Sequence, residues 1–555
     1  MMGPRSADSG GGEIPGGGLS QYEDTALARV NALLPETRIA QQMMFEAVLR
    51  GENHIEAPCG LGKTALAGLL LAAQPLTWAG RLFVATSTRA QAEQAYGFAQ
   101  EMVTAELADE AHLLLGAEQY LCNDRRQANG LQPLSGGTMR HEFPQEKDWS
   151  RSSHDPECCD ANECMDDCYY EARARVVDAR RAVVVVTHAR AVYEHRFGTL
   201  KTHPGDLLLV DEAHNVPGAL RQHMGCDLRA VTLHNLHRQH PRAGFKRAGV
   251  LLDSVLHSVH IDPKDGWAEV TGTPLTDVLT AVEAIRAATK KAEKAKSRRE
   301  TELRLANDPS MLRWVEEDDR GRRVLMVRDP DTAGNFTDLA RGYGRVVTMS
   351  ATLDGLPAAD LGVTVWQAPA EFDVAGNRTE ALMPAVDDED AVRKAVEAVV
   401  AHGGRALVLA KSSNIEVGGR SVRQIDALAD ALKDAGLRVG VQQGTHSVPK
   451  LAGDLRAGRV DVLVGLASMR EGLDVPGPSL GLVVLACSLW PNMTDPLLTL
   501  RRRNTWAIPC GERDVAQRQA FGRLLRSASD TGTVLCLFIK DSERRAFEAN
   551  LRGTR

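Results

Sequence analysis

The chain has 555 residues, several times the length of a usual domain, so we expect three or four domains with ample core. Apolar residues make up 43% and charged residues 25%; the absence of a long uncharged apolar run and of a secretory N-terminus argues against a membrane partner and predicts a cytoplasmic protein. The net charge of −7 argues against attraction of the whole molecule to nucleic acid, although local basic patches are compatible with it.

The start of the chain predicts a flexible tail followed by a helix. Residues 1–20 are rich in glycine, which is typical of a flexible segment. Residues 36–48 have apolar residues at helical spacing and include Gln41. A glutamine amide can both donate to and accept from an adenine edge, so Gln41 is a candidate nucleotide contact. An ordinary polar helix residue is the alternative.

A phosphate-binding loop is predicted at Ala57–Thr64, which fits the pattern of a small residue, four residues and Gly-Lys-Thr. Gly60 and Gly62 let backbone N–H groups turn toward phosphate oxygens. Lys63 supplies a positive charge and Thr64 a hydroxyl for Mg²⁺. Helical residues follow at once, so the anion would lie at a helix N-terminus. The alternative is an ordinary glycine-rich turn.

Residues 81–86 predict a short apolar strand, and the segment after it leads into a helix. Alternating strands and helices predict a parallel sheet with ligands beyond the carboxyl ends of the strands. Thr88 and Arg89 lie at that end and are candidates for contact with a nucleic-acid backbone. For Thr88, capping of the following helix is an equal alternative.

Five of the ten cysteines gather in about a tenth of the chain: Cys122, Cys158, Cys159, Cys164 and Cys168. Disulfides are unlikely in a reducing compartment, so the cluster indicates a metal site. Cys159, Cys164 and Cys168 would supply three thiolates and Cys122 a fourth, with Cys158 able to replace Cys159. Four thiolates suit zinc or an iron–sulfur cluster, and the spacing leaves both open.

Two further apolar strands are predicted at residues 182–188 and 207–210. The second delivers Asp211, Glu212 and His214 at its carboxyl end. Asp211 is placed to hold Mg²⁺ and Glu212 to polarise the attacking water, which is what ATP hydrolysis needs. Acidic pairs at strand ends are common, but one that follows a phosphate loop in the same sheet points strongly to this chemistry.

Residues 220–338 contain no site motif, are rich in charge, and predict an inserted helical domain. The basic stretch at residues 285–303 is either a solvated helix face or a contact for phosphates. The sheet resumes in a strand at residues 345–352, which ends in hydroxyl residues able to sense a neighbouring phosphate site.

A second α/β unit is predicted from about residue 355. One of its strands is followed by Ser412, and another leads to Glu471 and Asp474. Gln519, Arg523 and Arg526 then fall at helical spacing on one face, a separation of four and seven residues. Two arginines on one face can neutralise charge on a transferring γ-phosphoryl group. Surface salt bridges are the alternative.

The order of these motifs resembles that of superfamily 2 helicases, and the details resemble the XPD/DinG iron–sulfur branch. The matching stretches are motifs I, II, III, V and VI of that family, at residues 57–64, 211–214, 350–352, 471–474 and 519–526. A four-cysteine segment before motif II and a helical insert after it strengthen the resemblance. Residues 186–189 and 465–474 are more similar to the bacterial DinG side.

The resemblance implies an α/β fold with two RecA-like parallel-sheet motor domains, an inserted iron–sulfur domain and an inserted helical arch domain. It implies the cofactors ATP, Mg²⁺ and a 4Fe-4S cluster, the cluster being held by the cysteines above. The expected boundaries are a tail at 1–20, motor domain 1 at 21–116, 176–222 and 339–355, the iron–sulfur domain at 117–175, the arch at 223–338 and motor domain 2 at 356–555.

The activity implied by the resemblance is ATP-driven 5′ to 3′ movement on single-stranded DNA, with unwinding of duplex or DNA/RNA hybrids. Expected partners are single-stranded DNA, forked or tailed duplex and R-loops, together with a DNA-repair partner or a CRISPR ribonucleoprotein, for a monomeric enzyme. The alternative is a nucleic-acid remodeller or CRISPR accessory subunit with a structural zinc module and little unwinding. Two departures from the DinG pattern, the short spacing from Cys164 to Cys168 and the doubled Cys158-Cys159, bear on which cysteines are ligands.

The resemblance assigns nucleotide contacts to residues from both motor domains: Gln41, Gly60, Gly62, Lys63, Thr64, Asp211, His214, Glu471, Asp474 and Gln519. Catalytic roles fall to Lys63, Asp211, Glu212, Arg523 and Arg526, and DNA contacts to Thr88, Arg89 and Ser412.

Overall fold

The computed structural model describes most of the chain, and the statements below concern those residues. The described residues are 39–58, 62–63, 65–74, 78–134, 139, 169–198, 200–369, 378–411, 413–442, 448–466, 469, 473, 475, 477–524 and 530–537. Within these ranges, no helix is both long and apolar enough to span a bilayer.

A seven-stranded parallel sheet forms the core of what we call the first sheet domain (described residues 39–224 and 329–369), in the order β11-β1-β10-β5-β2-β4-β3. Its strands are β1 (His54–Glu56), β2 (Arg81–Thr86), β3 (Glu110–Leu114), β4 (Ala182–Thr187), β5 (Leu207–Val210), β10 (Arg345–Ser350) and β11 (Trp366–Gln367). Val84 on β2 aligns with Val185 and Leu209 on its neighbours. These central strands are buried because helices cover both faces, which explains their continuous apolar runs.

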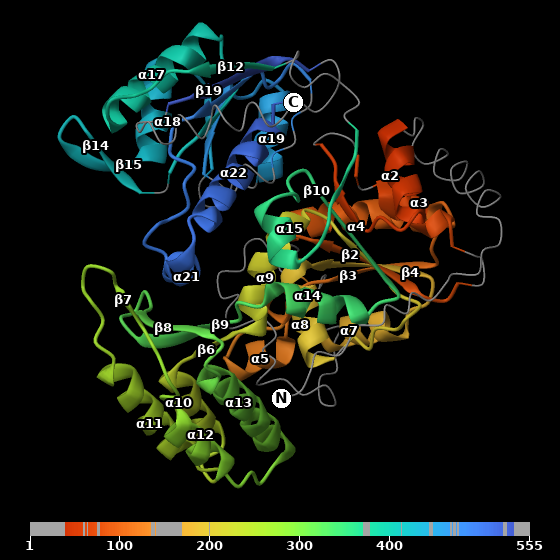
Figure 1. The fold of residues 1–555 in the computed structure, drawn as a ribbon, viewed down its shortest axis with the longest axis vertical. Helices are drawn as coiled ribbons and strands as arrows, with labels where there is room; N and C mark the ends of the chain where they lie inside the picture. Colours follow the sequence, from red (N-terminus) through yellow and green to blue (C-terminus); the bar gives the residue numbers. More distant parts are fainter. Residues whose placement is uncertain are drawn as a thin grey trace, which may run out of the picture.

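The helices of the first sheet domain lie on both sides of the sheet (Figure 1). They are α2 (Ile39–Leu49), α3 (Ala65–Ala72), α4 (Arg89–Thr104), α5 (Asn123–Ala128), α7 (Tyr169–Asp178), α8 (His188–Phe197), α9 (Val216–Met224), α14 (Thr332–Arg341) and α15 (Leu356–Leu361), with short 3₁₀ turns η1 (Ala117–Gln119) and η3 (Ala213–Asn215).

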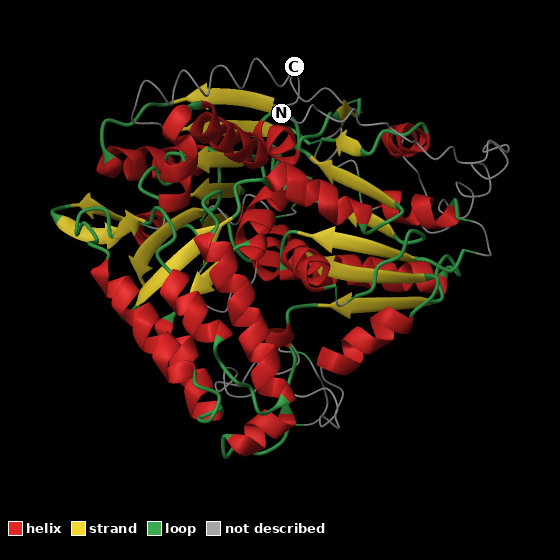
Figure 2. Cartoon of the chain, turned by 60° about the horizontal axis from the view of Figure 1, so that its bottom comes forward, coloured by secondary structure: helices red, strands yellow, loops and turns green. Residues whose placement is uncertain are grey.

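A six-stranded parallel sheet forms the second sheet domain (described residues 378–537), in the order β12-β19-β18-β13-β17-β16. Its strands are β12 (Arg378–Leu382), β13 (Ala406–Leu409), β16 (Val439–Val441), β17 (Val462–Gly465), β18 (Leu482–Leu485) and β19 (Gly532–Cys536), and a hairpin is formed by β14 (Asn414–Val417) and β15 (Arg420–Arg423). Its helices are α17 (Asp388–Ala401), α18 (Gln424–Asp434), α19 (Val448–Arg456), α21 (Pro496–Arg501), η4 (Arg502–Asn504) and α22 (Ala507–Phe521). Figure 2 shows the strands of the larger sheets flanked by helices.

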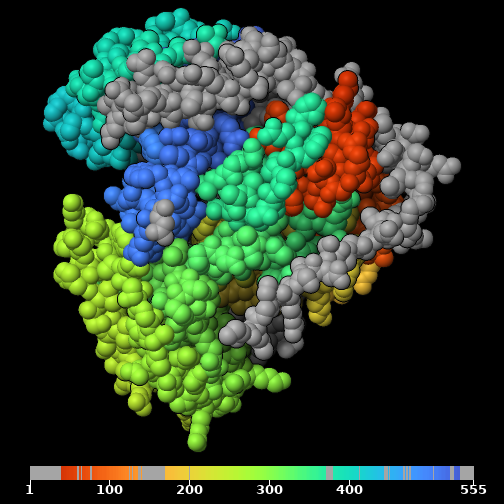
Figure 3. Space-filling view, viewed as in Figure 1, coloured from red at the N-terminus to blue at the C-terminus, as the bar shows by residue number. Residues whose placement is uncertain are grey.

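The insert domain (residues 226–328) has its own hydrophobic core. Its helices are α10 (Ala230–Gln239), α11 (Phe245–Ser258), α12 (Thr276–Glu283) and α13 (Lys290–Asn307), and its antiparallel sheet runs β6 (Cys226–Leu228), β9 (Arg323–Arg328), β8 (Leu312–Glu317), β7 (Trp267–Glu269). Figure 3 shows it as a yellow-green lobe that meets the blue α21 region.

The four-stranded sheet differs from the expected helical insert, for which no strands were predicted. The acidic stretch after β8 is a hairpin turn, in which Asp318 accepts hydrogen bonds from the backbone N–H groups of Arg320 and Arg322, both at 3.0 Å. Gly321 supplies the left-handed backbone that the turn requires, with φ 68°. The many charged residues around this turn obscured the strand pattern of the sequence on either side of it.

Two segments lie in a different unit from the one expected. Helix α14 begins at Thr332, before the expected end of the arch at residue 338, yet it packs in the core of the first sheet domain through Phe336 and Leu339. β11 pairs with β1, so the first sheet domain continues past the expected boundary at residue 355. Both segments are short, and only their tertiary contacts decide which domain they join.

Candidate nucleotide and nucleic-acid site

The described part of the phosphate loop lies at the carboxyl end of β1. Ala57 N–H donates to Ser350 O at 2.8 Å, which fixes the loop beside β10. Gly62 has φ 65°, and a Cβ there would lie 2.4 Å from Gln41 Nε2. Lys63 Nζ turns back to Ala57 O at 3.5 Å. The loop thus needs glycine at position 62 for both its backbone and its packing.

Gln41 lies on α2 and is buried against this loop. Its amide Nε2 donates to Gly62 O at 3.2 Å. The side chain therefore positions the loop backbone, a role that the sequence did not reveal, and its contact with an adenine edge stays a prediction.

The acidic pair follows β5. Asp211 N–H donates to Ala85 O at 2.8 Å, and Glu212 N–H donates to Asp211 Oδ1 at 2.9 Å. Glu212 has φ 50°, so the chain turns sharply and both carboxyl groups lie at the end of the strand. Burial, reinforced by Glu212 and opposed by Lys63, raises the pKa of Asp211 to about 6. A carboxyl group in this setting favours a bound cation, which would stabilise the charged form.

Two buried histidines flank the acidic pair. His188, the first residue of α8, lies with Nε2 2.7 Å from Asp211 O. Burial lowers the pKa of His188 to about 4, so the ring is neutral and donates to this carbonyl. His214 Nδ1 is 2.8 Å from Ser350 Oγ and 3.5 Å from Glu212 Oε2. The two histidines thus hold the loop in place, His188 at the Asp211 carbonyl and His214 at the Glu212 carboxylate.

A chain of hydrogen bonds runs from the acidic pair to the second sheet domain. Ser350 Oγ donates to Glu212 Oε2 at 3.5 Å and accepts from Thr352 N–H at 3.1 Å. Gln519 Nε2 donates to Thr352 Oγ1 at 2.7 Å, and Arg523 Nη2 donates to Gln519 Oε1 at 3.2 Å. We call these five residues the relay.

Arg523 departs from the expected geometry. The helix that carries Gln519, α22, ends at Phe521, and Gly522 is its C-cap. Arg523 lies in the turn that follows, where its Nη1 donates to Leu473 O at 2.9 Å. The predicted i, i+4 proximity to Gln519 survives because the turn continues to curl in the helical sense.

Two ion pairs join the two sheet domains, and no pattern in the sequence predicts them. Arg518 Nη1 is 3.2 Å from Glu56 Oε1, next to the phosphate loop, and its Nη2 donates to Asp354 O at 2.8 Å. Arg501 Nη2 is 3.0 Å from Asp360 Oδ2 on α15. No local pattern marks these residues, because each partner lies more than a hundred positions away.

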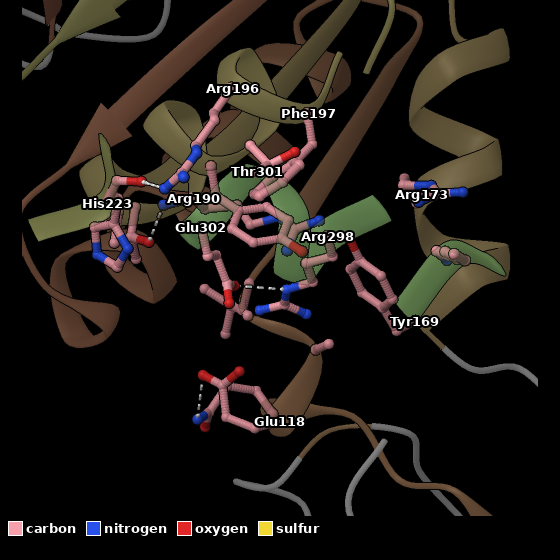
Figure 4. Close-up of a pocket in the computed structure, with 18 of the residues that line it drawn as sticks. Glu118, Tyr169, Arg173, Arg190, Arg196, Phe197, His223, Arg298, Thr301 and Glu302 are labelled. Carbon is pink, nitrogen blue, oxygen red and sulfur yellow. Dashed lines mark hydrogen bonds and ion pairs between the residues drawn. The ribbon is translucent and has the colours of Figure 1, made fainter. Parts of the chain in front are cut away.

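A cavity of about 790 Å³ lies between the first sheet domain and α13 of the insert domain (Figure 4). Six basic side chains line it: Arg89, Arg173, Arg190, Arg196, Lys294 and Arg298. Three aromatic rings share the lining, from Tyr169, Tyr193 and Phe197, and among the described residues that line the cavity Glu118 and Glu302 are the acidic ones. Basic and aromatic groups around a cavity of this size suit a single nucleic-acid strand.

Comparison with known proteins gives sequence matches to helicases. A family model described as a helicase C-terminal domain matches residues 396–540. The ATP-dependent helicases DinG of Mycobacterium tuberculosis and Mycobacterium bovis are each 28% identical to the chain over 260 residues, which is 41% of this chain. The match spans 38% of the length of these curated relatives.

Comparison with solved structures extends the similarity to the whole fold. An XPD helicase superposes with a TM-score of 0.56 at 14% identity, covering 93% of this chain and 98% of that one. The S. tokodaii protein Xpd4 gives 0.54 at 13% identity with the same coverage. The chain is thus similar in sequence to DinG helicases over part of its length, and similar in fold to XPD helicases over nearly all of it. Its two parallel-sheet domains are RecA-like, as the sequence predicted.

Thr88 and Arg89 stand at the start of α4. Thr88 caps the helix, since its side chain accepts from Gln91 N–H at 3.3 Å in a capping box. Arg89 donates to Gln119 Oε1 at 2.9 Å and lines the cavity. The capping alternative is confirmed for Thr88, while DNA contact by either residue stays a prediction.

Cys122 is the one predicted cysteine ligand among the described residues. It is buried at the N-terminus of α5, where its Sγ accepts from Arg125 N–H at 3.4 Å. Where the structure describes the chain, no three His, Cys, Asp or Glu side chains gather as a metal site. The ends of the cysteine segment meet nevertheless, because Tyr120 and Tyr169 stack edge to face at 5.6 Å.

Ten predicted site residues lie outside the described residues, so their roles stay predictions. They are Gly60, Thr64, Cys158, Cys159, Cys164, Cys168, Ser412, Glu471, Asp474 and Arg526.

Proposed function

We propose that the chain is an ATP-dependent DNA helicase that moves 5′ to 3′ on single-stranded DNA and separates duplex or DNA/RNA hybrids. The observation that carries the proposal is the relay, which links a buried carboxylate of one RecA-like domain to an arginine of the other. Helicases of this class couple ATP hydrolysis to movement between two such domains, and the relay provides a direct path for that coupling.

ATP would bind at the carboxyl end of the first sheet. Gly60, Gly62 and Lys63 would hold its phosphates, with Gln41 near the base. Asp211 and Thr64 would hold Mg²⁺, which neutralises phosphate charge, and the raised pKa of Asp211 supports a cation at that carboxyl group.

Hydrolysis would use groups from both sheet domains. Glu212, which Ser350 and His214 hold in place, would polarise the attacking water. Arg523 and Arg526 would neutralise charge developing on the γ-phosphoryl group. Arg523 is buried and bonded to Gln519, so it is already oriented in the structure. Glu471, Asp474 and Gln519 would complete the nucleotide contacts from the second sheet domain.

The basic cavity would hold the translocating strand. Arg89, Arg173 and Lys294, which line it, would neutralise phosphates, and Tyr193 and Phe197 would stack on bases. A second stacking surface is Trp506, which is 64% exposed with the Arg502 guanidinium 5.6 Å from its ring. A passage lined in this way suits one strand and excludes a duplex, which would make strand separation a steric consequence of movement.

A 4Fe-4S cluster on Cys122, Cys159, Cys164 and Cys168, with Cys158 as a substitute, belongs to the proposal. Support comes from the Tyr120–Tyr169 contact, which closes the base of the cysteine segment. The cluster would stiffen the segment beside the cavity. Visible absorbance of anaerobically purified protein that is lost in Cys164→Ser supports it; a colourless protein with one zinc contradicts it.

The test of the ATP-driven activity is Lys63→Ala. Removal of the phosphate-loop charge should lower DNA-stimulated ATP hydrolysis at least about a hundredfold and abolish unwinding. A Lys63→Ala protein that still unwinds a tailed duplex with ATP contradicts the proposal. Hydrolysis by the wild-type protein without unwinding supports the nucleic-acid remodeller instead.

A further inference from the structure

Helix α8 touches the proposed nucleotide site at its first residue. His188 Nε2 donates to the backbone carbonyl of Asp211 at 2.7 Å, and Thr187, the N-cap of the helix, accepts from Arg190 N–H at 3.2 Å. His188 is buried, so this bond lies out of competition with water. A shift of the Asp211 loop is therefore transmitted to the start of α8.

The middle of α8 holds the base of the cysteine segment. Arg190 and Glu194 form a buried ion pair along the helix. Tyr169 OH donates to Glu194 Oε1 at 3.1 Å, and the Arg190 guanidinium lies 4.6 Å from the centre of the Tyr169 ring. Tyr169 begins α7 and packs on Tyr120, so α8 holds both ends of the cysteine segment, one directly through Tyr169 and the other through the contact of Tyr120 with Tyr169.

The last turn of α8 holds the neck of the insert domain. Arg196 Nη1 donates to His223 O at 2.7 Å and to Gly225 O at 2.6 Å, where the chain passes from α9 to β6 (Figure 4). A Cβ at Gly225 would lie 2.0 Å from Val327 O, so the outgoing and returning strands are in close contact there. The Arg196 guanidinium thus fixes the chain that enters the insert domain at the point where it contacts the chain that returns from it.

We propose that α8 couples the nucleotide site to the insert domain, with Arg196 as the positioning residue at the neck. The helix has 10 residues, is about 15 Å long, and makes contacts at both ends, through the buried His188 and the half-buried Arg196. A packed helix moves as a unit rather than deforming, so displacement of the Asp211 loop turns or shifts the neck. The proposal rests on the proposed binding of ATP beside Asp211.

The charge of Arg196 is committed to this contact. Its guanidinium lies against two carbonyl groups; burial lowers the pKa of Arg196, and the nearby Cys226 and Glu302 oppose that shift. It lines the cavity, but its donors point at the neck, as the dashed contact in Figure 4 shows. Its role is therefore to position the insert domain, whereas the neighbouring basic side chains are those proposed for DNA.

The test measures movement of the insert domain when nucleotide binds. Bioorthogonal spectroscopic labels on two exposed helical positions, Gln100 of α4 and Ser254 of α11, report the distance between the first sheet domain and the insert domain. In the full-length wild-type protein, AMP-PNP with Mg²⁺ should shift the distance distribution. In Arg196→Met the shift should be lost and the distribution should be broader than in the wild-type protein, while Arg196→Lys, which keeps one donor group, should recover part of the shift.

The matched control is Arg323→Met. Arg323 also binds backbone carbonyls, with Nη1 3.0 Å from Leu256 O and 2.6 Å from Val259 O, but all its partners lie within the insert domain. This variant should keep the nucleotide-dependent shift. An equal loss of the shift in Arg323→Met, or a wild-type response in Arg196→Met, overturns the proposal.

Binding of a fluorescent ATP analogue to the same samples separates this inference from the proposed function. Failure of the wild-type protein to bind the analogue contradicts the proposed function. Binding without any shift of the insert domain leaves the proposed function intact and overturns the role of α8. A far-end variant, His188→Leu, should reduce the shift in the same way as Arg196→Met, because it breaks the other end of the same helix contact.

Discussion

At the scale of single residues, the acidic pair at the end of β5 concentrates the unusual chemistry. Asp211 lies where burial and an adjacent carboxylate both disfavour its charged form, and Lys63 compensates only in part. Glu212 is held in a left-handed backbone conformation that non-glycine residues seldom adopt. Such strain is retained when the surrounding structure enforces it, here through Ser350 and His214.

The raised pKa of Asp211 predicts a pH dependence of stability. The pKa rises from 3.8 to about 6, so between these values the folded protein binds the proton more tightly than the unfolded chain. The contribution of Asp211 to the free energy of unfolding is therefore present at low pH and lost as the pH rises through 6. Without metal, the unfolding midpoint of the wild-type protein relative to Asp211→Asn should fall by about 2–4 °C from pH 4.5 to pH 7.5.

Bound Mg²⁺ with ADP should remove this slope, because the cation favours the charged carboxylate. Thermal unfolding of both proteins with and without the metal nucleotide measures the effect. Parallel curves for the two proteins across this pH range would show that Asp211 titrates normally.

At the scale of elements, α22 joins the two sheet domains through one face. Gln519 bridges Thr352 and Arg523, so its amide uses both its donor and its acceptor capacity. It is buried, and replacing it by an apolar residue leaves both partners without that contact. The helix therefore holds the arginine at the far end of the relay from Glu212.

Gln519→Leu should lower kcat for ATP hydrolysis by roughly tenfold to a hundredfold with little change in KM, because a lost buried hydrogen-bond pair costs about 1–3 kcal/mol at the transition state. Gln424→Leu is the matched control, since Gln424 is equally buried in the second sheet domain but bonds Ala486 O at 2.9 Å, outside the relay. Steady-state kinetics below the unfolding range of both variants makes the comparison. Equal effects on kcat would show that the relay has no special role.

Elements defined by local pattern were predicted well, and contacts between distant elements were not. The sequence placed a helix, α3, directly after the phosphate loop and the acidic pair directly after β5, because apolar runs and strand ends are local signals. The antiparallel sheet of the insert domain was missed because charge hid the alternation in β8 and β9. The grip of Arg196 on the neck depends on a backbone carbonyl, whose position no side-chain pattern reveals.

At the scale of the whole molecule, ion pairs hold three units together. Glu56 and Arg518 join the sheet domains beside the phosphate loop, and Asp360 and Arg501 join them at α15. Arg503 on η4 and Glu269 on β7 join the second sheet domain to the insert domain (Figure 1). Partly exposed pairs contribute little stability each, so these contacts can break and re-form during a cycle of opening and closing.

The Glu56–Arg518 pair predicts a charge-swap result. Arg518→Glu places like charges at the domain interface and should raise KM for ATP roughly fivefold, since a single partly exposed pair is worth about 1 kcal/mol. The double variant Glu56→Arg, Arg518→Glu should recover most of the loss. Arg513→Glu is the control, because Arg513 pairs with Asp514 within α22 at 2.6 Å. No recovery in the double variant would mean that the pair does not hold the domains together.

The proposed function requires that ATP hydrolysis between the sheet domains drives a single DNA strand through the basic cavity. The most direct measurement compares ATP-dependent unwinding of a 5′-tailed and a 3′-tailed duplex by the wild-type protein and by Glu212→Gln, which keeps the shape of the side chain but lacks the base. The account predicts separation of the 5′-tailed duplex by the wild-type protein, little separation of the 3′-tailed duplex, and none by Glu212→Gln. Unwinding that survives in Glu212→Gln, or that prefers the 3′ tail, would contradict it.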